Sequence, residues 1–434
     1  MDKIRKIALD ILIEYERENT YTNLSLKKHL RNIENERDKK FISALVYGVI
    51  EKKIFLDFYI SKFSSVKLKK INVVVLTILR MGFYQLQFMN VPQSAACNTS
   101  VTLAKTNGQY KSAGFVNAIL RKLATDFDKV VLPEKNTIEY LSVKYSISQK
   151  NAQKLIDTFG LNGFVEFMDN INSSVNYLYA AVNTKKVNSS ELIEQLEKNG
   201  IVANLTEFDG LIKISSGFNI ENSDCFKKGL FHIIGYTSYI AAMAAKPDNN
   251  QVVYDVCSAP GGKTFAIAYK TNNTNKIYSF DLHEHKIANV KNSCERLGLE
   301  NIVCSVMDAT CFNESLVESA DVVLCDVPCS GLGMIFKKPD IKYKDIDFDS
   351  IVCTQKKILS NASKYLKNSG KLIYSTCTVN KEENIDVINE FLNDNSDFYL
   401  DTDYEIYKNQ KGQALILPDE NHSEGFYVAV LSKK

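Results

Sequence analysis

Two cysteines and one aspartate, Cys329, Cys377 and Asp326, have the types and surroundings needed for covalent catalysis. Asp326 opens the segment DVPCSGLG, and Cys377 lies in YSTCTVNKEEN. A thiolate is the nucleophile of covalent catalysis, and a nearby carboxyl group can supply a proton. Cysteines often only fill space in a core, but Ser and Thr neighbours in loops argue against that role here. We therefore predict that these three side chains form a reactive centre.

A glycine-rich loop, Asp255–Thr264 with the sequence DVCSAPGGKT, follows the apolar run Val252-Val253-Tyr254. A strand that enters a glycine turn and then a helix is typical of nucleotide-type sites, because glycines let backbone N–H groups approach a ligand at the helix N-terminus. The Walker A phosphate loop requires a glycine where this chain has Cys257. The GxGxxG spacing of dinucleotide-binding proteins does not occur in the loop either. The loop therefore predicts a different nucleotide-like ligand.

Acidic side chains at the ends of two predicted strands indicate what that ligand is. Asp281 ends one strand (YSFD), where a carboxylate typically accepts hydrogen bonds from ribose hydroxyls, and Asp308 follows the next strand (VMDA), within reach of an adenine amino group. Ligands of doubly wound sheets bind outside the carboxyl ends of the strands. An aspartate after a strand is often only a turn residue, but together with the glycine loop these two favour an adenosyl ligand over a phosphate ligand.

The sequence from about residue 236 onwards alternates between apolar runs and helical periodicity, which favours a doubly wound parallel sheet. The predicted strands are Val252–Asp255, Ile277–Phe280, Ile302–Val306, Val322–Cys325 and Leu372–Tyr374, with helices near 264–270, 285–297, 351–367 and 382–394. Two late runs, Ala414–Leu417 and Phe426–Leu431, have no helix between them. We expect these two to form an antiparallel hairpin at the sheet edge.

The part of the chain before residue 236 divides into two regions. Up to about residue 125 the apolar residues fall at helical spacing, as in Ile4, Ile7 and Ile11. From about 134 to 235 the signals mix, which indicates a small α/β module. The mixed signals are the helical stretches Gln149–Thr158 and Ser190–Lys198 and the strand-like runs Tyr177–Val182 and Leu211–Ile214.

Charge is distributed unevenly along the 434 residues, although the net charge is only +2. Residues 1–128 contain 21 Lys and Arg against 12 Asp and Glu, whereas the remainder contains 32 against 39. A basic first third on a nearly neutral protein indicates contact with a polyanion such as RNA. The alternative interpretation is a solvated charged surface on a helical domain.

The composition also restricts the cellular setting. A hydrophobic content of 45% and a charged content of 24% are ordinary for a globular protein. No apolar run reaches the length of a membrane span, and the N-terminal MDKIRKIALDILIEYE predicts a charged amphipathic helix rather than a signal peptide. Ten cysteines without a signal peptide indicate free thiols in the cytoplasm. No CxxC pair occurs and histidine is scarce, so we expect no metal site.

Three separated motifs, CSAPGGKT, DVPCSGLG and STC, give the chain a specific resemblance. Over about residues 229 to 431 it resembles the S-adenosylmethionine-dependent RNA cytosine-5 methyltransferases of the Sun/Fmu/Nol1/Nop2 group. The N-terminal third, with LVYGVI, VPQSAACNTSVTLAK and FVNAILRKL, resembles NusB-type RNA-binding domains, a combination found in bacterial enzymes that act on 16S rRNA. The resemblance implies a multidomain protein, with an all-α NusB-like domain at 1–130, a small α/β (RRM-like) module at 131–235 and a Rossmann-like α/β methyltransferase domain at 236–434.

The resemblance also implies individual roles. Cys377 would be the nucleophile, Cys329 the second thiol that serves product release, and Asp326 the catalytic acid. The implied contacts of S-adenosylmethionine are Cys257, Ser258, Ala259, Pro260, Gly261, Gly262, Lys263, Asp281, Asp308 and Asp326. The expected partner is RNA, most simply 16S rRNA, bound by a monomer without DNA or a membrane.

The chain departs from the pattern of the resembled family in three places, of which Ser258 in place of the more usual Ala is a trivial change. Ile234-Gly235 stands where Gln-Asp is frequent, and Phe336-Lys337-Lys338 stands where arginines are common. These departures leave the fit to the substrate open.

Three alternatives remain open at the level of sequence. DNA cytosine-5 methyltransferases use the thiol of a Pro-Cys pair, which here is Cys329. The substrate could also be tRNA or another rRNA. Finally, a NusB-like module could belong to an RNA-binding assembly factor without catalytic activity.

Overall fold

The computed structural model describes residues 2–18, 22–173, 177–215, 220–403, 405–419 and 421–434. The chain forms two compact units. Unit 1 consists of Met1–Asp157 and Pro339–Asp345, and unit 2 of Thr158–Lys338 and Ile346–Lys434. The domain boundaries given by sequence analysis stay a prediction.

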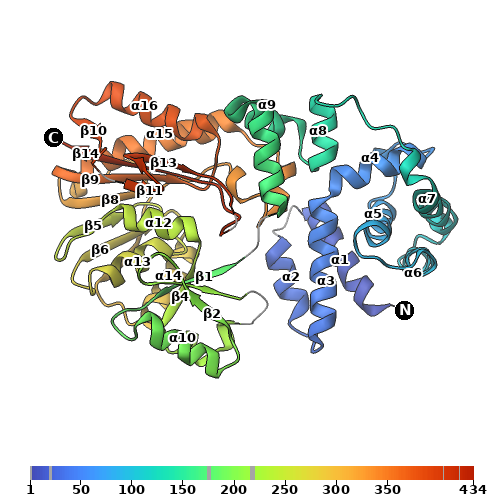
Figure 1. Cartoon of the computed structure of the whole chain (residues 1–434), viewed down its shortest axis with the longest axis horizontal. Coiled ribbons are helices and arrows are strands. Elements are labelled where there is room, and N and C mark those ends of the chain that lie inside the picture. The colour runs from blue at the N-terminus through green and yellow to red at the C-terminus, as the bar shows by residue number, and fades with distance from the viewer. Residues whose placement is uncertain (1, 19–21, 174–176, 216–219, 404, 420) are drawn as a thin grey trace. The chain divides into compact units, whose positions relative to one another are not determined.

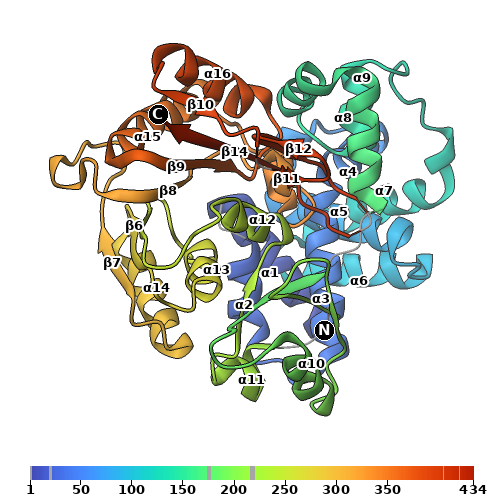
Figure 2. The same cartoon turned by 60° about the vertical axis from the view of Figure 1, so that its left-hand side comes forward.

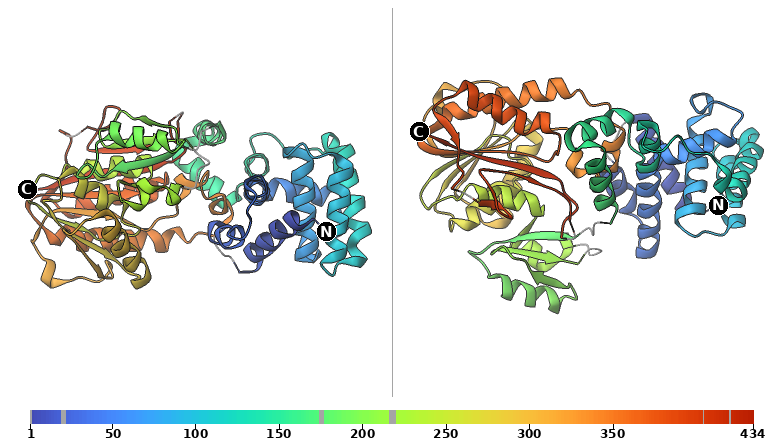
Figure 3. Two further views of the ribbon diagram at one scale, coloured as in Figure 1. Left: turned by 90° about the horizontal axis from the view of Figure 1, so that it is seen from below. Right: turned by 45° about the horizontal axis from the view of Figure 1, so that its top comes forward.

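The described residues of unit 1 up to Asp157, blue to blue-green in Figure 3, form helices joined by loops. Its long apolar helix α5 (Val73–Phe88) begins where the Asn72 side chain accepts a hydrogen bond from the Val74 N–H, as an N-cap residue does. Arg80 on α5 is buried and makes a bidentate pair with Asp57 at 2.7 Å. The other main helices are α1 (Lys3–Glu18), α2 (Thr22–Leu30), α3 (Glu36–Glu51), α4 (Lys53–Phe63), α6 (Gln93–Thr106), α7 (Ala113–Asp126) and α8 (Ile138–Tyr145).

A short piece of chain from the second half of the sequence is also part of unit 1. It is the 3₁₀ turn η7 (Pro339–Tyr343). The Tyr343 hydroxyl donates to the carbonyl of Glu51 at 2.6 Å and accepts from the Lys53 N–H at 3.1 Å. These contacts tie η7 to the junction of α3 and α4.

Unit 2 begins with the second half of α9 (Gln149–Ser173), whose backbone breaks at Gly160 with φ 71°. A small antiparallel sheet of order β2-β3-β1-β4 follows, green in Figure 2, with α10 (Ser189–Lys198) beside it. Its strands are β1 (Leu178–Val182), β2 (Ala203–Leu205), β3 (Leu211–Ile214) and β4 (Phe231–Ile234). Alternate residues of β1 and β3, such as Ala180 and Ile212, pack with Leu192 of α10 in one apolar core.

The main sheet of unit 2 has eight strands in the order β10-β14-β9-β8-β5-β6-β7, with β13 paired to β14. The five strands from β9 to β7 are mutually parallel, whereas β14 runs antiparallel to β9, β10 and β13. The strands are β5 (Val252–Asp255), β6 (Lys276–Asp281), β7 (Ile302–Val306), β8 (Ala320–Asp326), β9 (Leu366–Thr376), β10 (Phe398–Leu400), β13 (Gln413–Ile416) and β14 (Phe426–Lys433). The predicted fold class, a helical N-terminal part with a Rossmann-like C-terminal domain, is confirmed.

Helices cover both faces of this sheet (Figure 1). One face packs against α12 (Tyr236–Ala244), α13 (Gly262–Lys270) and α14 (Glu284–Leu297), and the other against α15 (Phe348–Tyr365) and α16 (Ile385–Asp394). Along β8 the side chains alternate between the two cores, with Val322 and Leu324 in one and Val323 and Cys325 in the other. Burial on both faces explains why the strands read as continuous apolar runs.

Two features are absent from the described residues. None of the helices in this part of the chain is long and apolar enough to cross a membrane. Within the same residues, no cluster of three or more His, Cys, Asp or Glu side chains is placed to hold a metal ion.

Candidate adenosyl and thiol site

Four acidic residues at or just after strand ends lie at one edge of the main sheet. Asp255, Asp281 and Asp326 are the last residues of β5, β6 and β8, and Asp308 follows β7. Because these strands are parallel, their carboxyl ends meet at the same edge. The topology thus gathers residues that are up to 71 positions apart in the sequence.

The glycine loop is shaped by its own close contacts. Gly261 has a φ of 98° and precedes α13, and a Cβ at this position would lie 2.4 Å from the ring of Phe265. Only glycine fits such a position. The Gly261 N–H donates to the carbonyl of Ser258 at 2.7 Å, and the Ser279 hydroxyl donates to the Ser258 hydroxyl at 2.6 Å. The loop is therefore held closely over the ends of β5 and β6.

The Asp281 carboxylate holds the same loop from below. It accepts from the N–H groups of Ala259 at 3.3 Å and His283 at 3.1 Å, and Lys286 lies 3.6 Å away. A carboxylate has about four acceptor positions, so capacity remains for further donors on the pocket side. This is the arrangement that a ribose diol requires.

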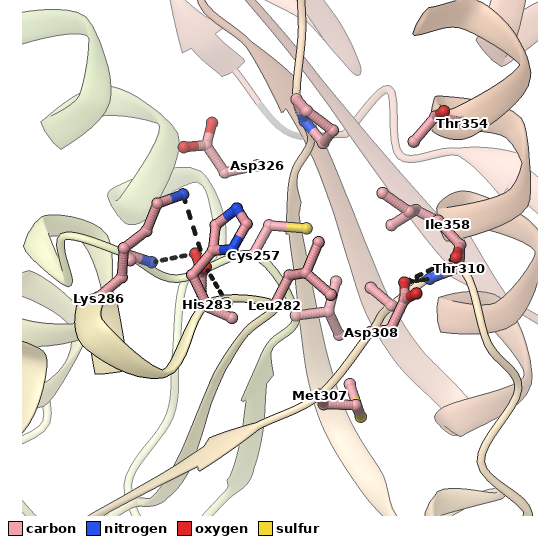
Figure 4. A pocket seen from close by; sticks show the side chains of 15 residues that line it. Cys257, Leu282, His283, Lys286, Met307, Asp308, Thr310, Asp326, Thr354 and Ile358 are labelled. Atoms are coloured by element: carbon pink, nitrogen blue, oxygen red, sulfur yellow. Dashed lines mark hydrogen bonds and ion pairs between the residues drawn. The ribbon is translucent and has the colours of Figure 1, made fainter. Parts of the chain in front are cut away.

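A pocket of about 270 Å³ opens beside these residues (Figure 4). Asp308 lies on its far side, where its carboxylate accepts from the N–H and the hydroxyl of Thr310 at 2.9 and 2.7 Å, and these bonds lower the pKa of Asp308. The pocket is lined by Val256, Cys257, Ala259, Asp281, Leu282, His283, Lys286, Met307, Asp308, Ala309, Thr310, Asp326, Pro328, Thr354 and Ile358.

The lining fits an adenosyl group. Apolar side chains such as Leu282 and Ile358 can cover a purine ring, while the carboxylates of Asp281 and Asp308 provide acceptors at either side. Among the predicted loop residues, Cys257 and Ala259 line the pocket, but Ser258, Pro260, Gly261, Gly262 and Lys263 do not. These five shape the loop or face elsewhere.

Asp326 links the pocket to the thiols. Its carboxylate accepts from the Lys263 ammonium at 2.7 Å and from the Ser375 hydroxyl at 2.8 Å. Lys263 is nearly buried, with 8% of its surface exposed. A buried ammonium needs a charged partner, so the lysine of the glycine loop is directed to Asp326 and not to solvent.

The two predicted thiols lie together. The sulfur atoms of Cys329 and Cys377 are 3.2 Å apart, on the loops that follow β8 and β9. A hydrogen bond from the Cys329 thiol lowers the pKa of Cys377 against the opposing effect of burial, and Lys338 and Lys263 act in the same direction as the bond. The same bond, together with burial, raises the pKa of Cys329. Cys377 is therefore the more acidic thiol of the pair.

One important residue of this centre, Glu383, was not predicted from the sequence. It is fully buried, and its Oε2 accepts from the Ser330 N–H at 2.8 Å and from the Gln355 amide at 3.3 Å. Its Oε1 accepts from the Asn380 amide at 3.0 Å. Glu383 thus joins the loop of Cys329 to the loop of Cys377. In the segment NKEEN nothing distinguishes it from the neighbouring Glu382, which is exposed to a greater degree.

Asp255, the fourth strand-end acid, has a different place. It is buried and does not line the pocket, and its Oδ2 accepts from the Thr264 hydroxyl at 2.6 Å. Burial raises its pKa to about 7, and the bond from Thr264 opposes that shift. Asp255 fixes the start of α13 from inside the core.

A parallel sheet with a glycine loop, two strand-end carboxylates and an adenosyl-sized pocket at its carboxyl edge defines a Rossmann-like methyltransferase, whose cofactor is S-adenosylmethionine. Residues 242–432 match the sequence model of the 16S rRNA methyltransferases RsmB/F, and residues 2–125 match that of the NusB family. The chain is 32% identical to the probable ribosomal RNA small subunit methyltransferase B of Bacillus subtilis over 448 residues, which covers 99% of each chain. It therefore belongs to the ribosomal RNA small subunit methyltransferase B (RsmB) family.

Other relatives agree with this membership. The chain is 29% identical to the probable ribosomal RNA small subunit methyltransferase B of Synechocystis, with 100% of both chains covered. The crystal structure of PH0851 superposes with a TM-score of 0.81 at 25% identity, covering 99% of this chain and 97% of that one. A methyltransferase homologue from Pyrococcus horikoshii gives a TM-score of 0.57 at 25% identity and covers 68% of this chain and 97% of its own. The predicted family is confirmed.

Proposed function

We propose that this protein transfers a methyl group from S-adenosylmethionine to C5 of a cytosine in RNA, and that the RNA is 16S rRNA. The observation that carries the proposal is the pair of sulfur atoms 3.2 Å apart, of which that of Cys329 follows closely in the chain on Asp326 and Pro328, two residues that line the adenosyl pocket. The matched family model and the curated relatives are named for 16S or small-subunit rRNA methylation, which supports the choice of substrate.

The chemistry explains why a thiolate is needed. C5 of cytosine is too electron-poor to attack a methyl group unaided, but a thiolate that adds to C6 makes C5 nucleophilic. We assign this addition to Cys377, whose pKa is lowered by the bond from Cys329. When bound, S-adenosylmethionine supplies the electrophilic methyl group.

Proton transfer falls to the neighbouring charged pair. As sulfur adds to C6, negative charge develops at N3 and must be neutralised. We assign the protonation of N3 to the carboxyl group of Asp326. The ammonium of Lys263, 2.7 Å from that carboxyl group, is the donor that supplies Asp326 with the proton. Ser375 holds the other oxygen of Asp326 and so orients the carboxyl group.

Release of the product is assigned to Cys329. After methyl transfer the C5 proton passes to water and the bond between C6 and the Cys377 sulfur breaks. The departing sulfur takes up negative charge, and the Cys329 thiol, 3.2 Å away, can stabilise it by a hydrogen bond. A good leaving group is thus prepared by the same contact that prepares the nucleophile.

RNA binding would involve the whole chain. The cytosine must leave any base stack to reach the thiols, at a cost of a few kcal/mol, and the basic surplus of residues 1–128 would hold the RNA backbone.

The test uses the two single thiol variants with 16S rRNA and S-adenosylmethionine. Cys377→Ala should abolish methylation and form no covalent adduct with RNA. Cys329→Ala should still attack and transfer the methyl group but release slowly, so that a protein–RNA adduct accumulates in denaturing gels.

Each alternative gives a different outcome. DNA-type use of the thiols would lose the adduct in Cys329→Ala and keep it in Cys377→Ala. Methylation of tRNA in preference to 16S rRNA would overturn the assignment of 16S rRNA as the substrate. If the wild-type protein binds RNA and neither thiol affects any methylation, the protein is a binding factor and the mechanism is wrong.

A further inference from the structure

A buried carboxylate outside the pocket, that of Glu424, lies in the loop between β13 and β14. Only 2% of the residue is exposed. Its Oε1 forms an ion pair with the Lys337 ammonium, and its Oε2 accepts from the hydroxyl of Thr237 at 2.6 Å and from its N–H at 3.3 Å. Burial alone would raise the pKa of Glu424, but Lys337 and Thr237 lower it below the ordinary value. The structure thus maintains a charge where burial disfavours one.

The Thr237 N–H belongs to the first turn of α12, and this turn lacks a cap of its own. The N-cap residue is Gly235, with the extended backbone of an N-cap (φ −68°, ψ 145°) but no side chain that could accept a hydrogen bond. A Cβ on residue 235 would lie 2.7 and 2.8 Å from the two oxygens of Glu424. The carboxylate of Glu424 therefore occupies the space where an N-cap aspartate would place its own.

The backbone next to Glu424 is connected to the nucleophile loop. The Gly425 N–H donates to the carbonyl of Gly333 at 2.7 Å, and the Gly333 N–H donates to the carbonyl of Cys377 at 3.2 Å. A Cβ on Gly333 would lie 1.9 Å from the Gly425 carbonyl oxygen, so the two backbone segments are in direct contact. Lys337, the partner of Glu424, directly precedes Lys338, whose charge acts on Cys377.

We propose that Glu424 is a positioning residue of the methyltransferase site. Its carboxylate caps α12 in place of the side chain that Gly235 lacks, and it anchors the segment of Lys337 and Lys338 beside Cys377. Two of the departures noted in the sequence, at Ile234-Gly235 and at Lys337, are then parts of one arrangement. The assignment rests on the proposed function only in taking Cys377 as the reactive thiol.

The experiment moves the carboxylate from one side of the contact to the other. Gly235→Asp alone would crowd a second carboxylate against Glu424, and Glu424→Ala alone would leave α12 uncapped and Lys337 without its partner. The double variant Gly235→Asp/Glu424→Ala restores one carboxylate at the same place. Each single variant should lower the thermal unfolding midpoint by about 2–4 °C, the shift expected for the loss of about 1 kcal/mol, and the double variant should recover most of that loss.

A second readout separates positioning from stability. The rate of alkylation of Cys377 by iodoacetamide, followed by mass spectrometry as a function of pH, reports how readily this thiol ionises. In Glu424→Ala the midpoint of that profile should move to higher pH and the rate at neutral pH should fall by about threefold or more. The value of kcat should fall with it, while KM for S-adenosylmethionine stays unchanged, because Glu424 does not line the pocket.

The control is Glu390→Ala, which removes the exposed partner of Lys356 and should change none of these quantities. If Glu424→Ala does not fold, Glu424→Gln keeps the shape without the charge and should show the same shift in the alkylation profile. An unchanged profile in folded Glu424→Ala or Glu424→Gln overturns the positioning role. A double variant no better than Glu424→Ala overturns the capping role. The unfolding midpoint and the alkylation profile use no RNA, so a failure of RNA methylation, which would affect only the kcat measurement, would be recognised separately.

Discussion

Replacing Asp281 by alanine is expected to weaken the binding of S-adenosylmethionine without unfolding the sheet. The carboxylate has about four acceptor positions, and the N–H groups of Ala259 and His283 use two of them. The remaining capacity faces the pocket, where a ribose diol can donate. Because the residue is 8% exposed, water replaces the lost acceptor only in part.

The magnitude follows from the charge of the acceptor. A hydrogen bond to a charged group contributes about 1.5–3 kcal/mol, so the dissociation constant should rise roughly tenfold to 150-fold. Asp281→Asn, which keeps one carbonyl oxygen but loses the charge facing Lys286, should fall between the wild type and Asp281→Ala. Asp248→Ala, a change of an exposed acidic residue, is the matched control and should bind as the wild type does.

Isothermal titration calorimetry measures these affinities directly, and thermal unfolding of each variant shows that it is folded. Unchanged affinity in folded Asp281→Ala would refute the assignment of this carboxylate to the ribose. Tighter binding of ATP than of S-adenosylmethionine by the wild type would refute the identity of the ligand.

Two further predictions concern the thiols and the basic unit. The alkylation of Cys377 should have its midpoint at a lower pH than that of an ordinary thiol, and Cys329→Ala should move this midpoint upward because the hydrogen bond that lowers the pKa of Cys377 is lost; an identical profile in both proteins would contradict this cause. Lys69→Gln/Lys70→Gln should weaken RNA binding and reduce the log–log salt slope by up to about 0.9 per phosphate contact on the estimate for duplex DNA, and by less for single strands. Lys270→Gln/Lys276→Gln, at the opposite edge of the sheet from the pocket, should not; equal slopes for both pairs would mean that the N-terminal charge is only solvated surface.

Local sequence patterns were sufficient to predict most elements of the methyltransferase fold. The strand Ile302–Val306 coincides with β7, and the late runs form the antiparallel pair β13 and β14. In contrast, β4 and α12 were not predicted, and α9 continues to Ser173, beyond the predicted Thr158. Short strands and helix ends depend on tertiary packing more than on periodicity, so a single sequence cannot fix them.

The residues of the candidate site likewise fall into those that the sequence could predict and those that it could not. Residues that act through their own chemistry, such as Asp281 and Cys377, stand in motifs and could be predicted. Glu383 and Glu424 could not, because each acts through groups that are distant in sequence, and an acidic residue in a polar loop is ordinarily solvated. The place of η7 in unit 1 is a further example, since nothing in the segment PDIKY indicates that the Tyr343 hydroxyl would bond to the backbone at the junction of α3 and α4.

The assignment of the two thiols also depends on an asymmetry that the sequence does not contain. Two sulfur atoms 3.2 Å apart cannot both carry a full negative charge at neutral pH, so when one thiol of the pair ionises the other keeps its proton. The hydrogen bond between the two thiols lowers the pKa of Cys377, against burial and Asp326, and the same bond together with burial raises the pKa of Cys329. Cys377 is therefore the thiol that ionises more readily, and the Pro-Cys thiol holds its proton more firmly. A DNA-type mechanism would need the opposite distribution, which makes the pH profile of each thiol, measured in the absence of RNA, an independent test of which residue attacks.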